Sequence, residues 1–233
     1  MATPRRIARL AQVLHRRQPE ILLALDGVHD PHNLSAILRS ADATGLTRIL
    51  WQPDQEDPDP PNPEVAMGTE RWVALEAVPN LREAILALKG NGYRVAATHL
   101  AADAVDFRQV DWTGSWIIVL GNEHRGCTDE ILSVTDVNIV LPMMGFVQSL
   151  NVSVAAAVLL YEVQRQRAAA GLYQRTLPTE TVRTLYERWG LANDGISCDD
   201  LLVPPASLPP SEQGHTDGRH KGKGRPKRQR GSG

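Results

Sequence analysis

The chain has 233 residues, of which 42% are hydrophobic and 22% are charged, enough apolar material for the core of one large domain or one domain with extensions. It contains no run of about 18 to 20 apolar residues that would span a membrane, and its first residues lack the pattern of a secretory signal. Two cysteines, Cys127 and Cys198, are too few for a disulfide framework or a four-thiolate metal site. We therefore expect a soluble cytoplasmic protein with no metal.

The formal net charge of −2 hides an uneven distribution. Seven basic residues and no acid occur between Arg219 and Arg230, so the remaining 18 basic residues face 27 acidic ones, a net charge of about −9. The first 19 residues also carry five arginines and no acid. Basic ends on an acidic body indicate an anionic partner. A charge run that only aids solubility is the alternative interpretation of the tail.

Hydrophobic periodicity and turn residues predict alternating strands and helices. In chain order we expect a helix at 5–17, a strand at 21–25, a helix at 31–43, a strand at 47–51, an acidic proline-rich loop at 52–64, a short strand from 72, a helix at 79–89, strands at 93–98, 116–120 and 137–141, and helices at 150–167 and 179–189. This alternation predicts an α/β fold with a mostly parallel sheet and helices on both faces.

Ligands of such sheets bind beyond the carboxyl ends of the strands. Three loops expected there carry polar residues, at 97–100, 120–126 and 141–151. The first strand is not followed by G-x-G-x-x-G, and no G-x-x-x-x-G-K-[ST] occurs, which disfavours a dinucleotide or P-loop enzyme.

Three segments contain candidate functional residues. In HDPHNLSAILRS (29–40), Asn33 taken alone is a helix cap and Arg39 a surface residue. LGNEHRGC (120–127) taken alone is an ordinary turn that leads into a short helix. In the third segment Gln148, Ser149 and Asn151 open an alanine-rich helix, whose free backbone N–H groups suit a polar ligand.

Together, NLSAILRS, LGNEHRG and LPMMGFVQSLNVSVAAAVLLYEVQRQR resemble the three signature motifs of the SpoU/TrmH class of RNA 2′-O-ribose methyltransferases, in the SPOUT superfamily. The resemblance covers about residues 3–175 and departs at His124, where relatives often carry lysine, and in the loop at 52–64. It implies a SPOUT-type α/β fold with a C-terminal deep trefoil knot at about 95–165. It also implies a homodimer in which two subunits complete each site, with S-adenosylmethionine bound in the knot.

The resemblance also assigns residues. Those implied to bind the cofactor are Thr98, Gly121, Leu141 and Leu150. Those implied to be catalytic are Arg39, Asn33, Glu123, Ser149 and Asn151. Arg39 either removes the proton of the ribose 2′-hydroxyl or anchors a phosphate and stabilises the alkoxide, and the second role is physically easier because free arginine is a poor base. Asn33 is expected to orient Arg39.

Only one arginine-rich helix precedes the first motif, which favours the transfer-RNA branch of the family, whose members methylate guanosine 18 in the D-loop. The residues expected to contact RNA phosphates are Arg5, Arg6, Arg9, Arg16 and Arg17. The alternatives are methylation of a ribosomal RNA nucleotide and a catalytically inert RNA-binding protein of the same fold. No protein partner beyond a second copy is evident.

The domain organisation expected from these observations has four parts. They are a basic N-terminal helix at 1–19, a methyltransferase domain at 20–175, a helical extension at 176–202 and a disordered basic tail at 203–233. The tail is rich in proline, serine and glycine and has no hydrophobic pattern, which is typical of a solvated segment.

Overall fold

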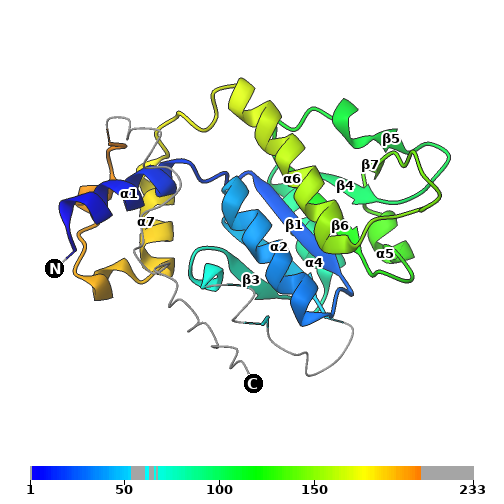
Figure 1. Ribbon diagram of the computed structural model, residues 1–233, viewed down its shortest axis with the longest axis horizontal. Coiled ribbons are helices and arrows are strands. Elements are labelled where there is room, and N and C mark those ends of the chain that lie inside the picture. Colours follow the sequence, from blue (N-terminus) through cyan, green and yellow to red (C-terminus); the bar gives the residue numbers. More distant parts are fainter. Residues whose placement is uncertain (1, 54–60, 63–65, 67, 206–233) are drawn as a thin grey trace, which may run out of the picture.

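The structure is a computed structural model that describes residues 2–53, 61–62, 66 and 68–205. Seven strands within these residues form one sheet, all parallel, in the order β3-β2-β1-β6-β4-β7-β5 (Figure 1). They are β1 (Ile21–Asp26), β2 (Arg48–Gln52), β3 (Ala74–Ala77), β4 (Arg94–Thr98), β5 (Val105–Asp106), β6 (Trp116–Gly121) and β7 (Val137–Val140). The predicted α/β class with a parallel sheet is confirmed.

The two longest strands, β1 and β6, lie side by side at the centre of the sheet. Every residue of both strands is buried, and they pair in register from Ile21 with Trp116 to Asp26 with Gly121. Strands that are covered on both faces are apolar at every position. Both strands could therefore be predicted from the continuous apolar runs at 21–25 and 116–120.

Helices cover both faces of the sheet. On one face α2 (Pro31–Thr44) and α6 (Val152–Ala169) pack against each other and against the sheet, and on the other face lie α4 (Leu81–Gly90) and α5 (Asp129–Leu132) (Figure 1). The described residues also contain four short 3₁₀ helices: η1 (Thr69–Arg71), η2 (Phe107–Gln109), η3 (Leu191–Asp194) and η4 (Asp199–Leu201). The expectation of helices on both faces is confirmed.

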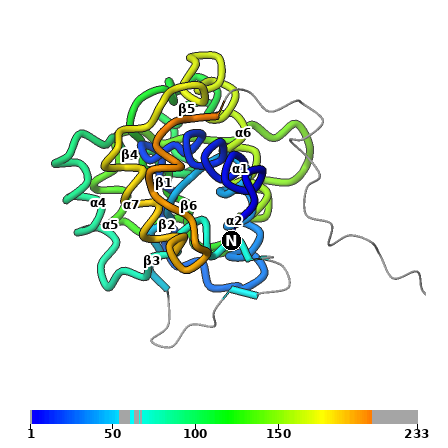
Figure 2. Tube along the Cα trace, turned by 90° about the vertical axis from the view of Figure 1, so that its left-hand side faces the viewer, coloured from blue at the N-terminus to red at the C-terminus, as the bar shows by residue number. Residues whose placement is uncertain are grey.

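The N-terminal helix and the C-terminal extension pack on each other (Figures 1 and 2). Helix α1 (Pro4–His15) contributes Leu14 and the extension contributes α7 (Thr179–Arg188) and Trp189 to a third apolar core. The buried His15 joins them further, because its Nδ1 accepts a hydrogen bond from the Leu177 amide (3.1 Å) and its Nε2 lies 2.9 Å from the Leu201 carbonyl oxygen. The two ends of the described chain thus form one unit, called here the terminal unit.

Two arginines are buried near the amino ends of the strands. Arg167, in the last turn of α6, donates to Gln18 Oε1 (2.7 Å), to Glu20 Oε2 (2.8 Å) and to the carbonyl oxygens of residues 112, 113 and 114. The terminal nitrogens of Arg17 donate to Asp42 Oδ1 (2.6 Å) and to the Leu46 carbonyl oxygen (3.0 Å). Burial of a guanidinium is tolerated only with such partners.

Within the residues just described, no helix is both long enough and apolar enough to cross a membrane. The predicted acidic loop at 52–64 lies largely outside the described residues, as does most of the predicted basic tail.

Candidate active site

A cavity of about 610 Å³ lies at the carboxyl ends of β4, β6 and β7. This volume falls within the range of about 300 to 1,000 Å³ that is usual for small-molecule sites. Its lining comes from residues 98–100, 120–126, 139–141, 143 and 148–152, together with Ala155 of α6. The three loops predicted from the sequence therefore meet around one cavity.

All four residues implied to bind the cofactor line this cavity: Thr98, Gly121, Leu141 and Leu150. Gly121 lies where the loop after β6 folds back on the strand, and a Cβ added there would stand 2.1 Å from the Gly126 carbonyl carbon and 2.3 Å from the Cys127 nitrogen. Only glycine allows this close approach.

The loop between β7 and α6 has its backbone groups available for a ligand. In the part of the chain that the structure describes, no backbone N–H or C=O of residues 142–150 is paired with another backbone group. Such groups need water or a ligand as a partner. A polar ligand bound beside this loop could supply such partners, and Leu141 and Leu150 add apolar side chains to the same cavity.

Three of the implied catalytic residues form a hydrogen-bonded chain across three elements. Asn33 of α2 donates from Nδ2 to Glu123 Oε1 (2.8 Å), and Asn151 donates from Nδ2 to Asn33 Oδ1 (3.1 Å). Asn151 Oδ1 in turn accepts from the Ser153 amide (2.9 Å) and caps α6. A fourth residue, Ser149, lines the cavity beside them. The structure therefore brings Asn33, Glu123, Ser149 and Asn151 together.

Asn33 is not a helix cap, because α2 begins two residues earlier and is capped by Asp30, whose side chain accepts from the His32 amide (2.8 Å). Asn33 lies within the first turn and is 9% exposed. Its side chain is therefore free to bond to Glu123 and Asn151.

Arg39 lies apart from this group. It is exposed on α2, six residues after Asn33 and so about 9 Å further along the helix axis, and it does not line the cavity. Within the described residues no hydrogen bond or ion pair involves it, and Asn33 bonds to Glu123 and Asn151 instead. The expectation that Asn33 orients Arg39 is wrong within a single chain.

The residue-by-residue prediction missed Asn122, which shapes the cavity wall. Its buried side chain donates from Nδ2 to the Gly27 carbonyl oxygen (2.8 Å) and accepts through Oδ1 from the His124 amide (2.9 Å). The only signal in the sequence was its place between Gly121 and Glu123.

Cys127 lies behind the same wall, with Sγ 3.6 Å from the Thr98 carbonyl oxygen. Burial and then the negative charge of Asp26 raise the pKa of Cys127 to about 12. The thiol is neutral near pH 7 and is no nucleophile.

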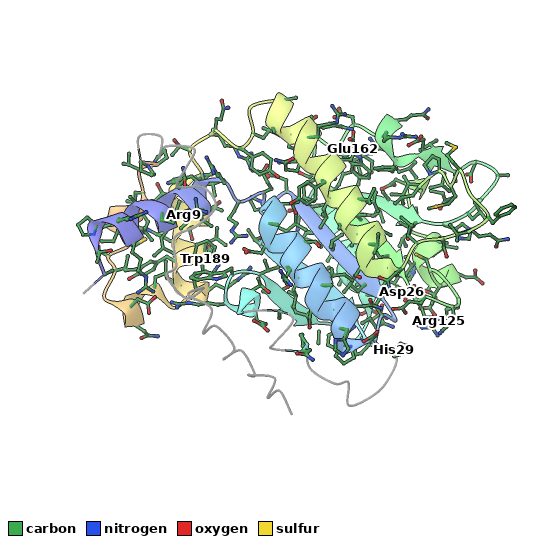
Figure 3. All side chains as sticks on the ribbon, viewed as in Figure 1. Arg9, Asp26, His29, Arg125, Glu162 and Trp189 are labelled. Carbon is green, nitrogen blue, oxygen red and sulfur yellow. The ribbon has the colours of Figure 1, made fainter. Side chains whose placement is uncertain are left out.

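The arginines predicted to contact RNA divide into two groups. Arg5 and Arg6 are exposed, and Arg9 and Arg16 are half-buried; burial and then the charge of Arg9 lower the pKa of Arg16. Arg9 lies in the terminal unit, at the opposite end of the molecule from Arg125 on the cavity wall (Figure 3).

The prediction that Arg17 contacts RNA is wrong. Its side chain is 1% exposed, forms the ion pair with Asp42 and stacks on Trp189 with 5.1 Å between the guanidinium carbon and the ring centre. Helix α1 ends at His15. Arg17 follows the end of the helix, where the chain enters the interior of the protein.

Comparison with known proteins identifies the family to which the chain belongs. The SpoU rRNA Methylase family matches residues 20–161. Over 190 residues the chain is 43% identical to the tRNA (guanosine(18)-2′-O)-methyltransferase of Escherichia coli strain K12, which covers 79% of this chain and 82% of that protein. The fold and the three loops define an RNA methyltransferase of the SpoU type, and the chain belongs to the SpoU family.

Two solved structures extend the comparison. The Aquifex aeolicus TrmH/SpoU tRNA modifying enzyme matches with a TM-score of 0.75 and 37% identity, over 83% of this chain and 98% of that one. The rRNA methyltransferase of Sinorhizobium meliloti, solved with S-adenosylmethionine bound, matches with a TM-score of 0.57 and 31% identity, over 66% of this chain and 59% of that one. The cofactor of the family is S-adenosylmethionine, and the cavity described above has a suitable volume and suitable groups for it.

Proposed function

We propose that this protein transfers a methyl group from S-adenosylmethionine to the ribose 2′-oxygen of guanosine 18 in tRNA. The observation that carries the proposal is the cavity at which the three predicted loops (97–100, 120–126 and 141–151) meet, with Asn33, Glu123 and Asn151 joined by hydrogen bonds. The RNA target follows the relatives from E. coli and A. aeolicus, whose likeness covers 79% and 83% of this chain. The proposal includes a cytoplasmic location for the protein.

The residues that would hold the cofactor are Thr98, Gly121, Leu141 and Leu150, with the unpaired backbone of the loop before α6. When bound, S-adenosylmethionine supplies a methyl group on a sulfonium. The protein has to hold the ribose oxygen about 3 to 3.5 Å from that methyl group and in line with the departing sulfur. Because Asn33, Glu123 and Asn151 hold one another, they can orient a ribose without rearranging.

Arg39 supplies the positive charge in this proposal. A guanidinium stays protonated at neutral pH, so it serves better to bind the adjacent phosphate and to stabilise the developing alkoxide than to accept a proton. Because Arg39 lies on the exposed side of α2, away from its own chain's cavity, we assign it to the site of a second copy.

The second copy is also supported by the exposed side of α6. Val154, Val158 and Tyr161, spaced by one helical turn, are 47%, 41% and 56% exposed, although the opposite side of the helix is buried in the core. Helix α2, which carries Arg39, packs directly against α6. Sedimentation should show a homodimer at micromolar concentration, and Val158→Arg should yield monomers. A wild-type monomer would exclude the shared site.

The proposal includes the deep trefoil knot at about 95–165. Strand β6 lies between β1 and β4, and after β7 the chain crosses back to α6 on the face that α2 also covers. We propose that this return is threaded, although connections in other folds almost never thread.

RNA contacts are assigned to Arg5, Arg6, Arg9 and Arg16, which are exposed or half-buried. Contacts with phosphates position an RNA without reading its sequence. Arg6 also pairs with Asp194 (2.9 Å), a surface pair weak enough to exchange for a phosphate.

Mass mapping of ribose-methylated nucleotides in total RNA, from cells with and without the gene, tests the function. Loss of 2′-O-methylguanosine at position 18 of tRNA is the expected result. Loss of a ribosomal modification instead would redirect the proposal to that nucleotide. No loss would favour an inert RNA-binding protein, although the chain retains Arg39, Ser149 and Asn151.

A further inference from the structure

We infer that Asn122 is a positioning residue for methyl transfer, which acts by fixing the neighbouring Glu123. This inference rests on the proposed function. It concerns the loop that follows β6, called here the hook loop (residues 122–126), which forms one wall of the cavity.

The hook loop is closed on itself. The backbone N–H of Asn122 donates to the Gly126 carbonyl oxygen (3.1 Å) and the N–H of Gly126 donates back to the Asn122 carbonyl oxygen (2.9 Å). Inside this closure the Asn122 side chain accepts from the His124 amide (2.9 Å). The loop therefore has a defined shape, but these bonds do not fix its position on the sheet.

The position is fixed by the end of β1. Asp26 and Gly121 are paired in the sheet, and one residue further along each strand the Asn122 Nδ2 donates to the Gly27 carbonyl oxygen (2.8 Å). Beyond the loop, the Thr128 amide donates to Asp26 Oδ2 (2.7 Å). Both ends of the hook loop are thus attached to the end of one central, buried strand.

Glu123 comes directly after this attachment. Its Oε1 accepts from Asn33 (2.8 Å), and Asn33 accepts from Asn151 at the start of α6. Glu123 itself is exposed, so little packing holds it in place. A displacement of about 1 Å in groups that position a substrate can lower a rate by up to about 10². The bond from Asn122 to Gly27 therefore sets where the polar chain lies relative to the cavity.

The test is Asn122→Asp, which keeps an oxygen for the His124 amide but cannot donate to the Gly27 carbonyl. Under saturating tRNA and S-adenosylmethionine, kcat should fall at least about tenfold, while calorimetry should show less than a threefold change in the Kd of S-adenosylmethionine. Asn122→Ser, which is neutral and too short to reach Gly27, should behave likewise and replaces the first variant if that one does not fold.

The matched control is Tyr93→Phe. It removes one side-chain hydrogen bond to a backbone carbonyl, that of Pro19 (2.9 Å), at the opposite end of the sheet, and should leave kcat unchanged. In a double-mutant cycle, Asn122→Asp should lower the kcat of a Glu123→Gln enzyme by less than threefold, because the two residues act as one unit.

Three results would overturn the inference: an unchanged kcat, a loss that parallels the loss of cofactor affinity, or additive effects with Glu123→Gln. If the wild-type protein does not methylate tRNA, the proposed function fails instead. An active wild type with an equally active Asn122→Asp variant overturns only the inference about Asn122.

Discussion

The two ends of the sheet use polar side chains in opposite ways. At the amino end, Arg17 and Arg167 are buried and their terminal nitrogens are engaged with carboxylates and carbonyls of the protein. At the carboxyl end Glu123 is exposed on the cavity wall, held there by Asn33, and between the two ends Arg39, on the exposed side of α2, has no partner among the described residues. A polar group whose bonds are satisfied internally contributes to folding, whereas one left without partners is available to a ligand.

The strongest test of this contrast is Arg39→Ala. Removing the cation that we assign to the developing alkoxide should lower kcat at least about a hundredfold, and cofactor binding should hardly change, because we assign the cofactor to Thr98, Gly121, Leu141, Leu150 and the loop backbone. Rapid-quench methyl transfer and calorimetry measure the two quantities. A cofactor affinity weakened more than about tenfold, or about 1.4 kcal/mol, would show that Arg39 belongs to the cofactor site after all.

At the amino end of the sheet, Arg17→Met should lower the stability of the folded protein. It removes the partner of Asp42 and leaves the Leu46 carbonyl without its donor, which should lower the free energy of unfolding by about 2 kcal/mol. Urea unfolding measures it, with Arg39→Met, expected to stay within about 0.5 kcal/mol of wild type, as the control. Equal stability of the two variants would contradict the view that Arg17 stabilises the fold and Arg39 does not.

The buried thiol of Cys127 should make the free energy of unfolding depend on pH, with no part in catalysis. The pKa of its thiol is raised from 9.0 to about 12 in the folded protein. Above pH 9 the unfolded chain loses this proton first, so stability should fall as the pH rises from 9 toward 12, by at most about 1.4 kcal/mol per pH unit.

Urea unfolding at pH 8 and pH 10 measures this fall, and Cys127→Ala should reduce it by about 1 kcal/mol. The control is Tyr173→Phe: burial raises the pKa of Tyr173 to about 12 as well, but its effect on stability develops mainly above its ordinary value of 10.0, so this variant should keep most of the fall between pH 8 and pH 10. An identical fall in the alanine variant would contradict the assignment to Cys127.

The smallest effect on catalysis is expected from truncation after Pro210, which removes the seven basic residues between Arg219 and Arg230. Each lost phosphate contact should reduce the slope of log affinity against log salt by a little under one unit, so we expect a change of about two to four units. The rate at saturating tRNA should hardly change. Filter binding at several salt concentrations measures the slope, and an unchanged slope would make the tail a solubility feature.

The sequence predicted the central sheet because β1 and β6 are continuous apolar runs, and it missed β5 because an element of two residues is too short to show a period. Arg17 was wrongly predicted to contact RNA because nothing in the sequence distinguishes it from the four other arginines near the N-terminus. Only the end of α1 at His15 separates this buried arginine from the others. The meeting of Asn33 with Glu123 depends on strand order, which no local pattern encodes.

The place of β6 in the sheet also has a consequence for how the chain is made. Strand β1 is complete at Asp26, but its neighbour on one side starts only at Trp116, so at about 5 to 20 residues per second a nascent chain waits on the order of ten seconds for it. During that time a strand that is apolar except for Asp26 keeps one unpaired edge, the kind of edge to which other chains add. Translation pauses before residue 116 should therefore do more harm to the yield of native protein than pauses after residue 121.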